Sequence, residues 1–360
     1  MDKINLKKVL SIYRDKKVFI TGHNGFKGSW LSYLLNYLGA DVYGYSLKNH
    51  SVLNHFDALK LESKIHHEIG DVRDYSKLSN AISNFQPDFI FHLAAQALVI
   101  DSYKDPMNTF TTNCIGSLNI LDIAKNSSFL KSFILVTSDK CYENLEWEYG
   151  YRENDRLGGH DPYSASKAGA EIIFSAYNRS FFHKNETCGV GSARAGNVIG
   201  GGDWSKNRII PDCIKAIENN KPIVIRNPNA TRPWQHVLEP LTGYLYLGYA
   251  LYRYPNMYSG SWNFGPKPSQ IKNVREVASK IIDNFGRGKL EIKKLEGQDH
   301  ESNLLQLNCD KSNQKLNWNP VWNIDKTLKY TAEWYKLFYH GEDPSEITSD
   351  QIKKYFKGAI

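Results

Sequence analysis

The chain of 360 residues lacks the features that mark several classes of protein. Its five cysteines are odd in number and contain no CxxC pair, which argues against a disulfide framework or a thiolate metal site and favours a reducing compartment. It has no run of five or six like charges, and a net charge of +7 is too diffuse for a nucleic-acid-binding arm. We therefore expect no metal and no nucleic-acid partner, and at most a mild attraction to small anions.

Long hydrophobic runs are also missing. No uncharged stretch approaches the roughly eighteen strongly apolar residues of a membrane span. The longest candidate, Pro240 to Tyr252, contains Gly, Thr and several Tyr and is too short. Residues 1–10 alternate charged and apolar side chains and contain no signal-peptide core. These absences predict a soluble, cytoplasmic protein that does not bind membranes.

The residues that are present are typical of a globular protein. Apolar residues make up 41% of the chain and aromatic residues 13%, while 26 glycines and 13 prolines follow no period. This composition excludes disorder and a collagen-like chain, and it is enough for a sizeable core. The length suggests two domains or one large one.

Short β-branched runs alternate with helical periodicity over the first half of the chain. The first run is followed by a glycine-rich turn, by an amphipathic stretch to Leu38 and by Gly39 as a helix stop. The predicted strands are 17–21, 41–45, 88–92, 133–137 and 188–194, with helical patterns at 119–124 and 164–176. Alternating strands and helices predict an α/β fold with a doubly wound parallel sheet, a Rossmann domain. Residues 1–15 predict an additional helix before the first strand.

The alternation weakens after about residue 195, where prolines become frequent. We predict a Rossmann domain over residues 1–195 and a smaller mixed C-terminal substrate lobe over residues 196–360, with elements that can interleave. The smaller lobe is expected over the carboxyl ends of the strands, where ligands bind in such sheets.

The first predicted strand leads into Gly22-His23-Asn24-Gly25-Phe26-Lys27-Gly28, a GxxGxxG pattern at the start of a helix. Glycines there allow a tight turn and let backbone N–H groups approach a pyrophosphate, while the helix N-terminus favours negative charge. The pattern alone is also compatible with a glycine turn without function. Its position between a strand and a helix favours dinucleotide binding.

The second predicted strand ends in Tyr45-Ser46-Leu47-Lys48, without the acidic residue that usually binds the adenosine ribose. The choice between NAD and NADP is therefore open at this point. Lys48 could pair with a 2′-phosphate or be an ordinary surface lysine. Asp71 is expected near the adenine, with a solvated loop aspartate as the alternative.

Tyr163 and Lys167 form a YxxxK pattern, which places both side chains on one helix face. The ammonium can then stabilise a phenolate and bring the tyrosine pKa down from near 10 toward the working pH. Tyr13 and Lys17 show the same spacing, so the pattern alone is weak. Tyr163 differs because it follows a predicted strand by one loop, with Pro162 at the expected helix start.

Together these motifs resemble the extended short-chain dehydrogenase/reductase superfamily, whose members act on nucleotide sugars. Three segments go further and resemble the CDP-glucose 4,6-dehydratase family. These three segments are Thr21 to Leu31, Thr137 to Tyr142 and Arg194 to Trp204, and the similarity extends over about residues 15–335. The segment Phe91 to Gln96 supports the resemblance to the superfamily.

The resemblance implies a catalytic set. Ser138 would hydrogen-bond the reacting sugar oxygen, Tyr163 would be the base and Lys167 the partner of its phenolate. Asp139 would give a proton to the departing hydroxyl. Related dehydratases carry Asp-Glu where this chain has Asp139-Lys140, so Lys140 joins the catalytic set while the identity of the carbon-5 base stays open.

His66 and His67 have no third ligand at metal spacing and are expected at the surface.

The resemblance also implies which residues contact ligands. The residues expected to bind NAD are Gly22, Asn24, Gly25, Phe26, Gly28, Asp71, Val72, Ala94, Ala95, Gln96, Tyr163 and Lys167. The residues expected to bind the nucleotide sugar are Asn197, Arg208, Arg232 and His236.

The implied function is that of a hydro-lyase. It would convert CDP-glucose to CDP-4-keto-6-deoxyglucose with NAD retained in the site, as a homodimer or homotetramer in deoxysugar synthesis for a surface polysaccharide. Two alternatives stay open: a nucleotide-sugar 4-epimerase or reductase, which would not need Asp139, and a dinucleotide-sensing protein without activity, which would need only the glycine loop.

Overall fold

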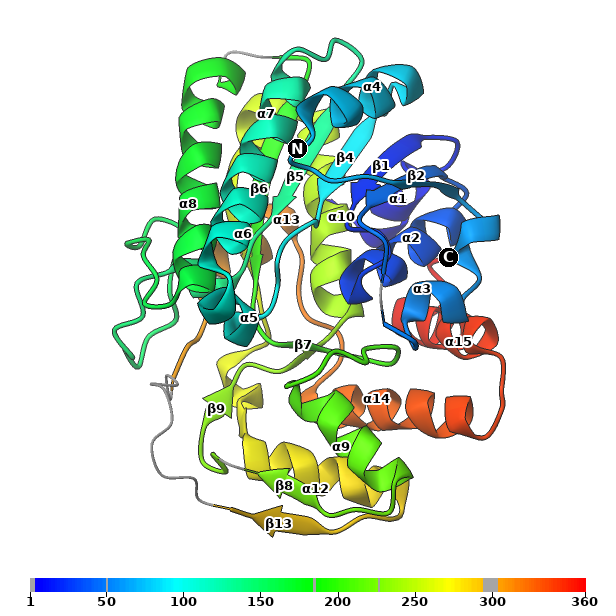
Figure 1. Cartoon of the computed structure of the whole chain (residues 1–360). Coiled ribbons are helices and arrows are strands. Elements are labelled where there is room, and N and C mark those ends of the chain that lie inside the picture. The colour runs from blue at the N-terminus through cyan, green and yellow to red at the C-terminus, as the bar shows by residue number, and fades with distance from the viewer. Residues whose placement is uncertain (1–3, 50, 184–185, 226, 294–303) are drawn as a thin grey trace.

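A seven-stranded parallel sheet forms the centre of the molecule (Figure 1). The computed structural model describes residues 4–49, 51–183, 186–225, 227–293 and 304–360. The strand order is β11-β6-β5-β4-β1-β2-β3, so the chain winds outward from β1 in both directions. The strands are β1 (Lys17–Thr21), β2 (Asp41–Ser46), β3 (His66–Ile69), β4 (Phe89–His92), β5 (Ser132–Val136), β6 (Gly189–Ala195) and β11 (Gly260–Phe264).

Helices cover both faces of the sheet because its central strands are apolar on both sides. In β1, Val18 and Ile20 belong to the core on one face and Phe19 to the core on the other. The first face is covered by α1 (Leu6–Ser11), α2 (Phe26–Tyr37) and α10 (Leu238–Arg253). The second face is covered by α4 (Tyr75–Phe85), α7 (Gly116–Lys125) and α8 (Pro162–Tyr177).

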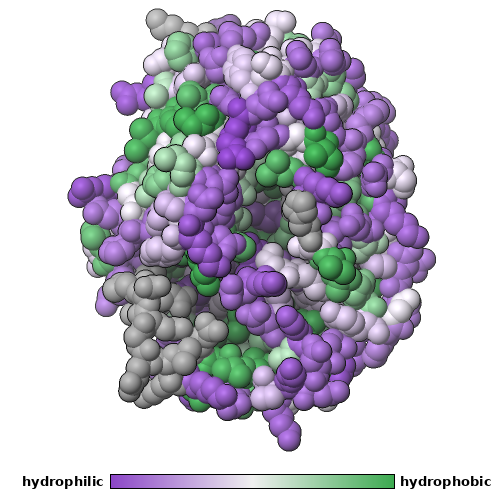
Figure 2. All heavy atoms as spheres, viewed as in Figure 1, coloured by the Kyte–Doolittle hydropathy of each residue, from purple (hydrophilic) through white to green (hydrophobic). Residues whose placement is uncertain are grey.

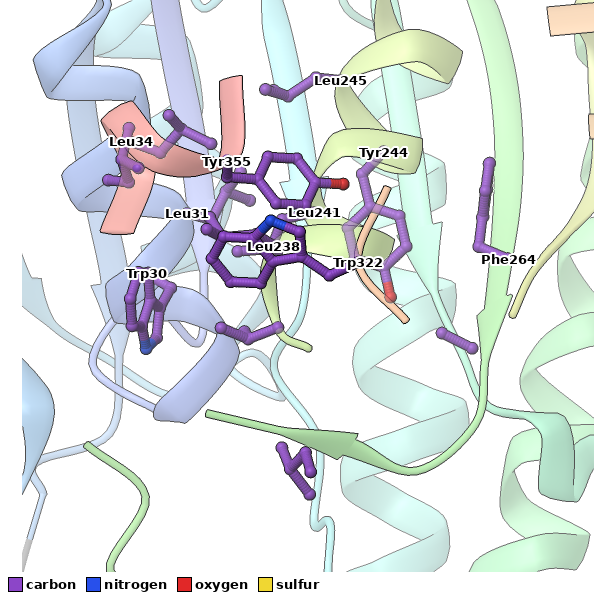
Figure 3. Packing of buried hydrophobic residues seen from close by; sticks show 14 of the residues in the cluster. Trp30, Leu31, Leu34, Leu238, Leu241, Tyr244, Leu245, Phe264, Trp322 and Tyr355 are labelled. Atoms are coloured by element: carbon purple, nitrogen blue, oxygen red, sulfur yellow. The ribbon is translucent and has the colours of Figure 1, made fainter. Parts of the chain in front are cut away.

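The larger core joins the sheet to the C-terminal part of the chain. Trp322 and Tyr355 from the end of the chain lie between Trp30 of α2 and Tyr244 of α10 in this core (Figure 3). The Trp30 indole donates to the carbonyl of Gly201 at 2.9 Å. Each such buried side chain contributes about 1.5–3 kcal/mol, so the end of the chain helps to hold α2 in place.

The smaller lobe lies over the carboxyl ends of the strands, at the bottom of Figure 1. It combines short strand pairs (β7 with β10, β8 with β13, β9 with β12) with helices. Its strands are β7 (Val198–Ile199), β8 (Ile223–Ile225), β9 (Thr231–Arg232), β10 (Gln235–His236), β12 (Lys272–Asn273) and β13 (Leu290–Ile292); the helices of this half are α9 (Ile209–Glu218), α11 (Pro255–Tyr258), α12 (Val274–Phe285), α13 (Asp310–Leu316), α14 (Ile324–Tyr339) and α15 (Pro344–Phe356). The first half adds the short helices α3 (His55–Ala58), α5 (Val99–Lys104) and α6 (Pro106–Phe110).

The expected fold class is confirmed, and all five predicted strands exist with ends shifted by two residues or fewer. The helix expected in residues 1–15 is present as α1, while residues 1–3 lie outside the described part. After residue 195 the chain returns to the main sheet, where α10 packs on β5 and β11 pairs with β6. The two lobes therefore interleave, and the division at residue 195 stays a prediction.

The structure can be compared with the expectations on membrane spans, metal sites and disulfides. Over the described ranges, no helix combines the length and apolarity that a membrane crossing needs. Within the same ranges, no cluster of three His, Cys, Asp or Glu side chains is arranged to hold a metal ion. All five cysteines are free thiols.

Candidate active site

A cavity of about 1850 Å³ opens at the carboxyl ends of the strands, between the sheet and the smaller lobe. Figure 2 shows a hollow in the middle of this face, bordered largely by hydrophilic side chains. Its wall is built from the ends of β1, β2, β4, β5 and β6, the start of α8, and the segment around α9. This is the position at which a doubly wound sheet binds ligands.

The glycine loop lies against the end of β4 and begins α2. Gly22 has a φ of +71°, and a Cβ on it would lie 2.7 Å from the Ala94 nitrogen. A Cβ on Gly28 would lie 2.0 Å from the carbonyl oxygen of Gly22. Both glycines are therefore required by close backbone approach, and the first turn of α2 lines the cavity. This geometry suits a pyrophosphate.

Most of the other residues expected at the dinucleotide line the cavity. Asn24 donates from its side-chain amide to the Leu47 carbonyl at 2.7 Å, which fixes the glycine loop to the end of β2. The carboxylate of Asp71 accepts from the guanidinium of Arg73, which holds the pKa of Asp71 below its usual range. Asn24, Gly25, Phe26, Asp71, Val72, Ala94 and Ala95 all contribute to the wall.

Gln96 is not among the residues that line the cavity, although its neighbours Ala95 and Ala97 are. Its side chain is occupied by the loop that follows: the amide donates to the Leu98 carbonyl and to Thr109, and its oxygen accepts from the Leu98 N–H. Its backbone is held by Asn113. Gln96 thus shapes the loop beside the cavity, and a motif match cannot distinguish this from ligand contact.

Ser138, Asp139 and Lys140 follow β5 directly and line the cavity. Ser138 caps a 3₁₀ turn, and its hydroxyl donates to Asp139 Oδ1 at 2.9 Å. Only 3% of Asp139 is exposed, and burial raises the pKa of its carboxyl. Its Oδ2 atom has no hydrogen-bond partner among the described residues. A buried carboxyl with a raised pKa and an unused oxygen can carry a transferable proton.

Tyr163 and Lys167 lie one turn apart on α8, which starts at Pro162 with Asp161 as its N-cap. The Lys167 ammonium donates to the Val136 carbonyl at 3.4 Å, directly before the Ser138 turn. Burial lowers the pKa of Lys167 to about 8. Burial raises the pKa of Tyr163 to about 12, although a hydrogen bond with Ser138 and the charge of Arg208 act in the opposite direction.

A buried ion pair holds this set together. Glu171, two turns after Tyr163 on α8, accepts from the Arg194 guanidinium at 2.7 Å and from the Thr137 hydroxyl. Burial by itself would raise the pKa of Glu171, but Arg194 holds it below its usual range. The pair ties α8 to the ends of β5 and β6, and Glu171 counteracts the loss of charge at Lys167.

Three of the four residues expected at the substrate line the cavity: Asn197, Arg208 and Arg232. Arg208 pairs with Asp203 at 2.8 Å and is close enough to Tyr163 to favour its ionised form. Arg232 donates from one guanidinium nitrogen to the Thr231 carbonyl. The structure therefore brings guanidinium groups and the Ser138–Tyr163 pair to one cavity.

The fourth residue expected at the substrate, His236, lies elsewhere. It is fully buried and lies outside the cavity wall, with edge contacts to Trp30 and Trp322 at ring distances of 5.9 and 4.7 Å. Burial lowers its pKa to about 3, so it is a neutral core side chain. The position of His236 close to Arg232 in the sequence does not determine which way its side chain points. In β10 the side chain of His236 is buried in the core.

Sequence reasoning missed Lys27, which stands inside the glycine pattern at a position the pattern leaves free. It lines the cavity, and its ammonium lies 5.9 Å from the centre of the Tyr244 ring. Burial lowers the pKa of Lys27 to about 7, and the nearby charges of Lys167 and Arg208 add to this shift. The sequence signal that could have identified Lys27 is its position in the first turn of the helix that follows the glycine loop.

The comparisons with known proteins agree with this geometry. Residues 19–247 match the family described as GDP-mannose 4,6 dehydratase. A CDP-glucose 4,6-dehydratase of Salmonella typhimurium is 43% identical over 349 residues, which cover 96% of this chain and 97% of that protein.

Solved structures share the fold. An epimerase from Methanothermobacter thermautotrophicus has a TM-score of 0.80 at 22% identity, covering 93% of this chain and 96% of its own. A dTDP-glucose 4,6-dehydratase from Bacillus anthracis in complex with NAD has a TM-score of 0.76 at 21% identity, covering 92% of this chain and 99% of its own.

Proposed function

The chain belongs to the GDP-mannose 4,6-dehydratase family, and from this premise we propose that it is an NAD-dependent hydro-lyase that converts CDP-glucose to CDP-4-keto-6-deoxyglucose. We choose CDP as the nucleotide of the substrate because the Salmonella relative, a CDP-glucose 4,6-dehydratase, is similar to this chain along almost its whole length. The observation that carries the proposal is Asp139, a buried carboxyl hydrogen-bonded to Ser138 in the wall that also holds Tyr163 and Lys167.

NAD fits the residues that are present. The glycine loop leaves space for a pyrophosphate at the start of α2, and Ala94 and Ala95 offer a wall with small side chains. Gly22, Gly25 and Gly28 would hold the pyrophosphate, and Asp71 and Val72 would border the adenine. The chemistry that bound NAD supplies is removal of a hydride from carbon 4 and its return at carbon 6.

The residues of this chain would handle the protons. Tyr163 takes the proton of the 4-hydroxyl, and Ser138 hydrogen-bonds the same oxygen. Tyr163 needs nearby positive charge to act as a base at neutral pH. The charge of Arg208 lowers its pKa, and we assign the same role to Lys167, one turn away on α8. The 4-ketone that results makes the carbon-5 proton acidic.

Loss of the 6-hydroxyl needs an acid because hydroxide is a poor leaving group. We assign this proton to Asp139, whose buried carboxyl holds a proton more readily than an exposed one. Lys140 lies beside it in the cavity wall, and we assign it the removal of the carbon-5 proton. In Lys140→Met, exchange of the carbon-5 position with solvent deuterium should slow more than oxidation at carbon 4.

The alternatives make different demands on the site. A 4-epimerase or reductase needs Ser138, Tyr163 and Lys167 but does not need a buried acid at Asp139. A dinucleotide-sensing protein needs none of these four residues. The buried carboxyl therefore favours dehydration over both.

We further propose a homodimer or homotetramer that works in the cytoplasm. The surface over α7 and α8 gathers apolar side chains (Figure 2), and Ile115, Ile172 and Phe181 are among the exposed large hydrophobic residues. Exposed apolar groups of this kind favour association. The free thiols agree with a reducing compartment. Light scattering on the purified chain gives the number of subunits.

The experiment that tests the proposed function is incubation with CDP-, UDP-, GDP- and dTDP-glucose, followed by mass spectrometry. The proposal expects loss of one water from CDP-glucose. A product of unchanged mass with an inverted 4-hydroxyl would indicate an epimerase, and dinucleotide binding without turnover of any of the four would indicate the sensing protein.

A further inference from the structure

Asp203 is a buried acidic residue that takes no part in the proton transfers of the proposed reaction. It lines the cavity, and only 4% of the residue is exposed. It follows β7 and three glycines, where the backbone passes close to other parts of the chain. A Cβ on Gly201 would lie 2.0 Å from the Trp334 ring, and a Cβ on Gly202 would lie 2.3 Å from the His55 ring. Only glycine permits this approach, so the backbone in front of Asp203 has a defined path.

Helix α14 holds the backbone of Asp203 from the other side. The hydroxyl of Tyr335 accepts from the Asp203 N–H at 2.9 Å and donates to the Asp203 carbonyl. The next residue, Trp204, packs edge-on against Trp334 and Tyr335 at ring distances of 5.7 and 6.0 Å. One carboxylate oxygen of Asp203, Oδ1, accepts from the Ser205 N–H at 3.0 Å. The position of the carboxylate is therefore fixed by its surroundings.

The second carboxylate oxygen of Asp203 binds Arg208. The distance from Oδ2 to the Arg208 Nη1 atom is 2.8 Å. Asn207 has a φ of +61°, and Arg208 follows it as the N-cap of α9. The Arg208 side chain is 34% exposed, and within the described ranges no other hydrogen bond or ion pair is recorded for its guanidinium. Because an arginine side chain has many rotamers, this single ion pair decides where its charge lies.

Arg208 needs such an anchor because it lies among other cations. Burial, followed by the charges of Lys167 and Arg208, lowers the pKa of Lys27 in the same wall. Repulsion between like charges favours a half-exposed guanidinium that turns away into solvent. The Asp203 carboxylate opposes this repulsion, since it attracts Arg208 through a charge-assisted hydrogen bond.

The position of Arg208 matters for Tyr163. Burial raises the pKa of Tyr163, the charges of Asp139 and Asp161 raise it further, and the charge of Arg208 lowers it. If Arg208 moved away, the two carboxylates would be opposed only from α8, by Lys167. The hydrogen-bonding and titratable groups that face Tyr163 are Ser138 and Asp139 after β5, Asp161 and Lys167 on or before α8, Arg208 before α9, and Tyr244 on α10.

We propose that Asp203 is a positioning residue of the reaction, which holds the Arg208 guanidinium beside Tyr163, where its charge stabilises the phenolate. The inference rests on the proposed function, because it takes Tyr163 as the base of the oxidation step. It adds a carboxylate that acts through Arg208, and it makes Tyr335 of α14 part of the support of the site.

The test is the acidic limb of kcat/KM against pH, measured with the NAD-loaded full chain and CDP-glucose. This limb reports the ionisation of the essential base in the enzyme without substrate. Asp203→Asn keeps an oxygen for the Ser205 N–H, but its amide nitrogen cannot accept from Arg208. We expect the limb to move upward by about 0.5–1 pH unit, because a nearby opposite charge shifts a pKa by about one unit or more. A limb that does not move, or that moves downward because a negative charge is gone, overturns the proposal.

A second substitution separates action through Arg208 from a direct effect of Asp203. Arg208→Met should move the limb upward by itself, and Asp203→Asn in that background should add less than about 0.2 pH unit. Equal shifts by Asp203→Asn with and without Arg208 would overturn the positioning role. Glu218→Gln is the matched control, since it breaks an arginine–carboxylate pair of 2.7 Å with Arg287 at the far end of α9, where neither residue lines the cavity. It should leave the limb unchanged.

Thermal unfolding shows whether each variant folds. If Asp203→Asn does not fold, Tyr335→Phe decides, because it keeps the ring against Trp204 and removes only the hydroxyl that holds the Asp203 backbone. We expect a smaller upward shift of the limb in Tyr335→Phe. An unchanged limb in this variant would then overturn the proposal.

Crystal structures of the native chain and of Asp203→Asn test the position of Arg208 without turnover. We expect the guanidinium to turn away from Tyr163 in the variant, and an unchanged position overturns the inference while the dehydratase activity stands. If the native chain dehydrates no nucleotide sugar, the proposed function fails, and the two crystal structures still decide whether Asp203 holds Arg208.

Discussion

Replacement of Asp139 by asparagine separates dehydration from oxidation. The asparagine oxygen can still accept from the Ser138 hydroxyl, which donates to Asp139 Oδ1 at 2.9 Å in the native chain. The transferable proton is lost. General acid catalysis is worth about 10² to 10⁴ in rate, which corresponds to about 3–5 kcal/mol in the barrier for expulsion of the 6-hydroxyl.

The fold should survive this change. The new amide nitrogen replaces Oδ2, which has no hydrogen-bond partner in the described part of the chain, so a buried unsatisfied donor costs about 1–3 kcal/mol at most. Asp101→Asn is a matched control, because Asp101 also lines the cavity but pairs with Lys104 at 3.3 Å on α5. Thermal unfolding of both variants measures the structural cost separately from the chemistry.

The assay mixes the Asp139→Asn enzyme, loaded with NAD, with CDP-glucose and follows the absorbance of reduced nicotinamide and the yield of 6-deoxy product. We expect the absorbance to rise and the product to form slowly, because oxidation at carbon 4 continues while water is not expelled. Product formation at the native rate without an absorbance signal would refute the role of Asp139 as the acid.

Three further predictions address the rest of the site and the fold. Tyr163→Phe should keep the native circular dichroism spectrum and lose turnover by at least about 10², since the ring still packs but the proton acceptor is absent; retained turnover would remove Tyr163 from the mechanism. Lys167→Ala should shift the acidic limb of the pH–rate profile upward, because the phenolate loses the cation one turn away on α8, and an unchanged profile would argue against that role. Burial lowers the pKa of four histidines to about 3, so they stay neutral in the folded state while the unfolded chain takes up protons below about pH 6.5. Stability should therefore fall as the pH decreases from about 6.5 toward 3, by up to about 1.4 kcal/mol per pH unit for each histidine, and urea midpoints that do not change between about pH 7.5 and 5.5 would contradict this. These histidines are His23, His55, His92 and His236.

The sequence predicts the central strands because they are buried on both faces and therefore read as continuous β-branched and apolar runs. It does not predict β3 (His66–Ile69), because three of its four residues are polar and the strand is partly exposed at the edge of the sheet. It also misses β11, because Gly260 to Phe264 pairs with β6 across a large sequence separation and carries no local strand signal. Local patterns describe faces and turns, whereas edge strands and late returns to a sheet depend on tertiary pairing.

In the candidate site, too, local motifs predict some residues, while the positions of others depend on tertiary packing. Residues fixed by a motif at a strand end, such as Ser138 and Tyr163, reach the cavity because the carboxyl ends of parallel strands meet there. His236 and Gln96 do not, since the direction of a single side chain is set by packing against Trp322 in one case and by the loop after β4 in the other. Lys27 was missed because its importance comes from burial beside other cations, which only the folded chain creates.

The most direct measurement of the central claim is a labelling experiment with CDP-glucose carrying deuterium at carbon 4. If the chain is a 4,6-dehydratase that keeps its cofactor bound through the cycle, mass spectrometry and NMR will show a product lighter by one water with deuterium at carbon 6. Deuterium lost to the solution, or a product that retains all its oxygen atoms, would contradict the account.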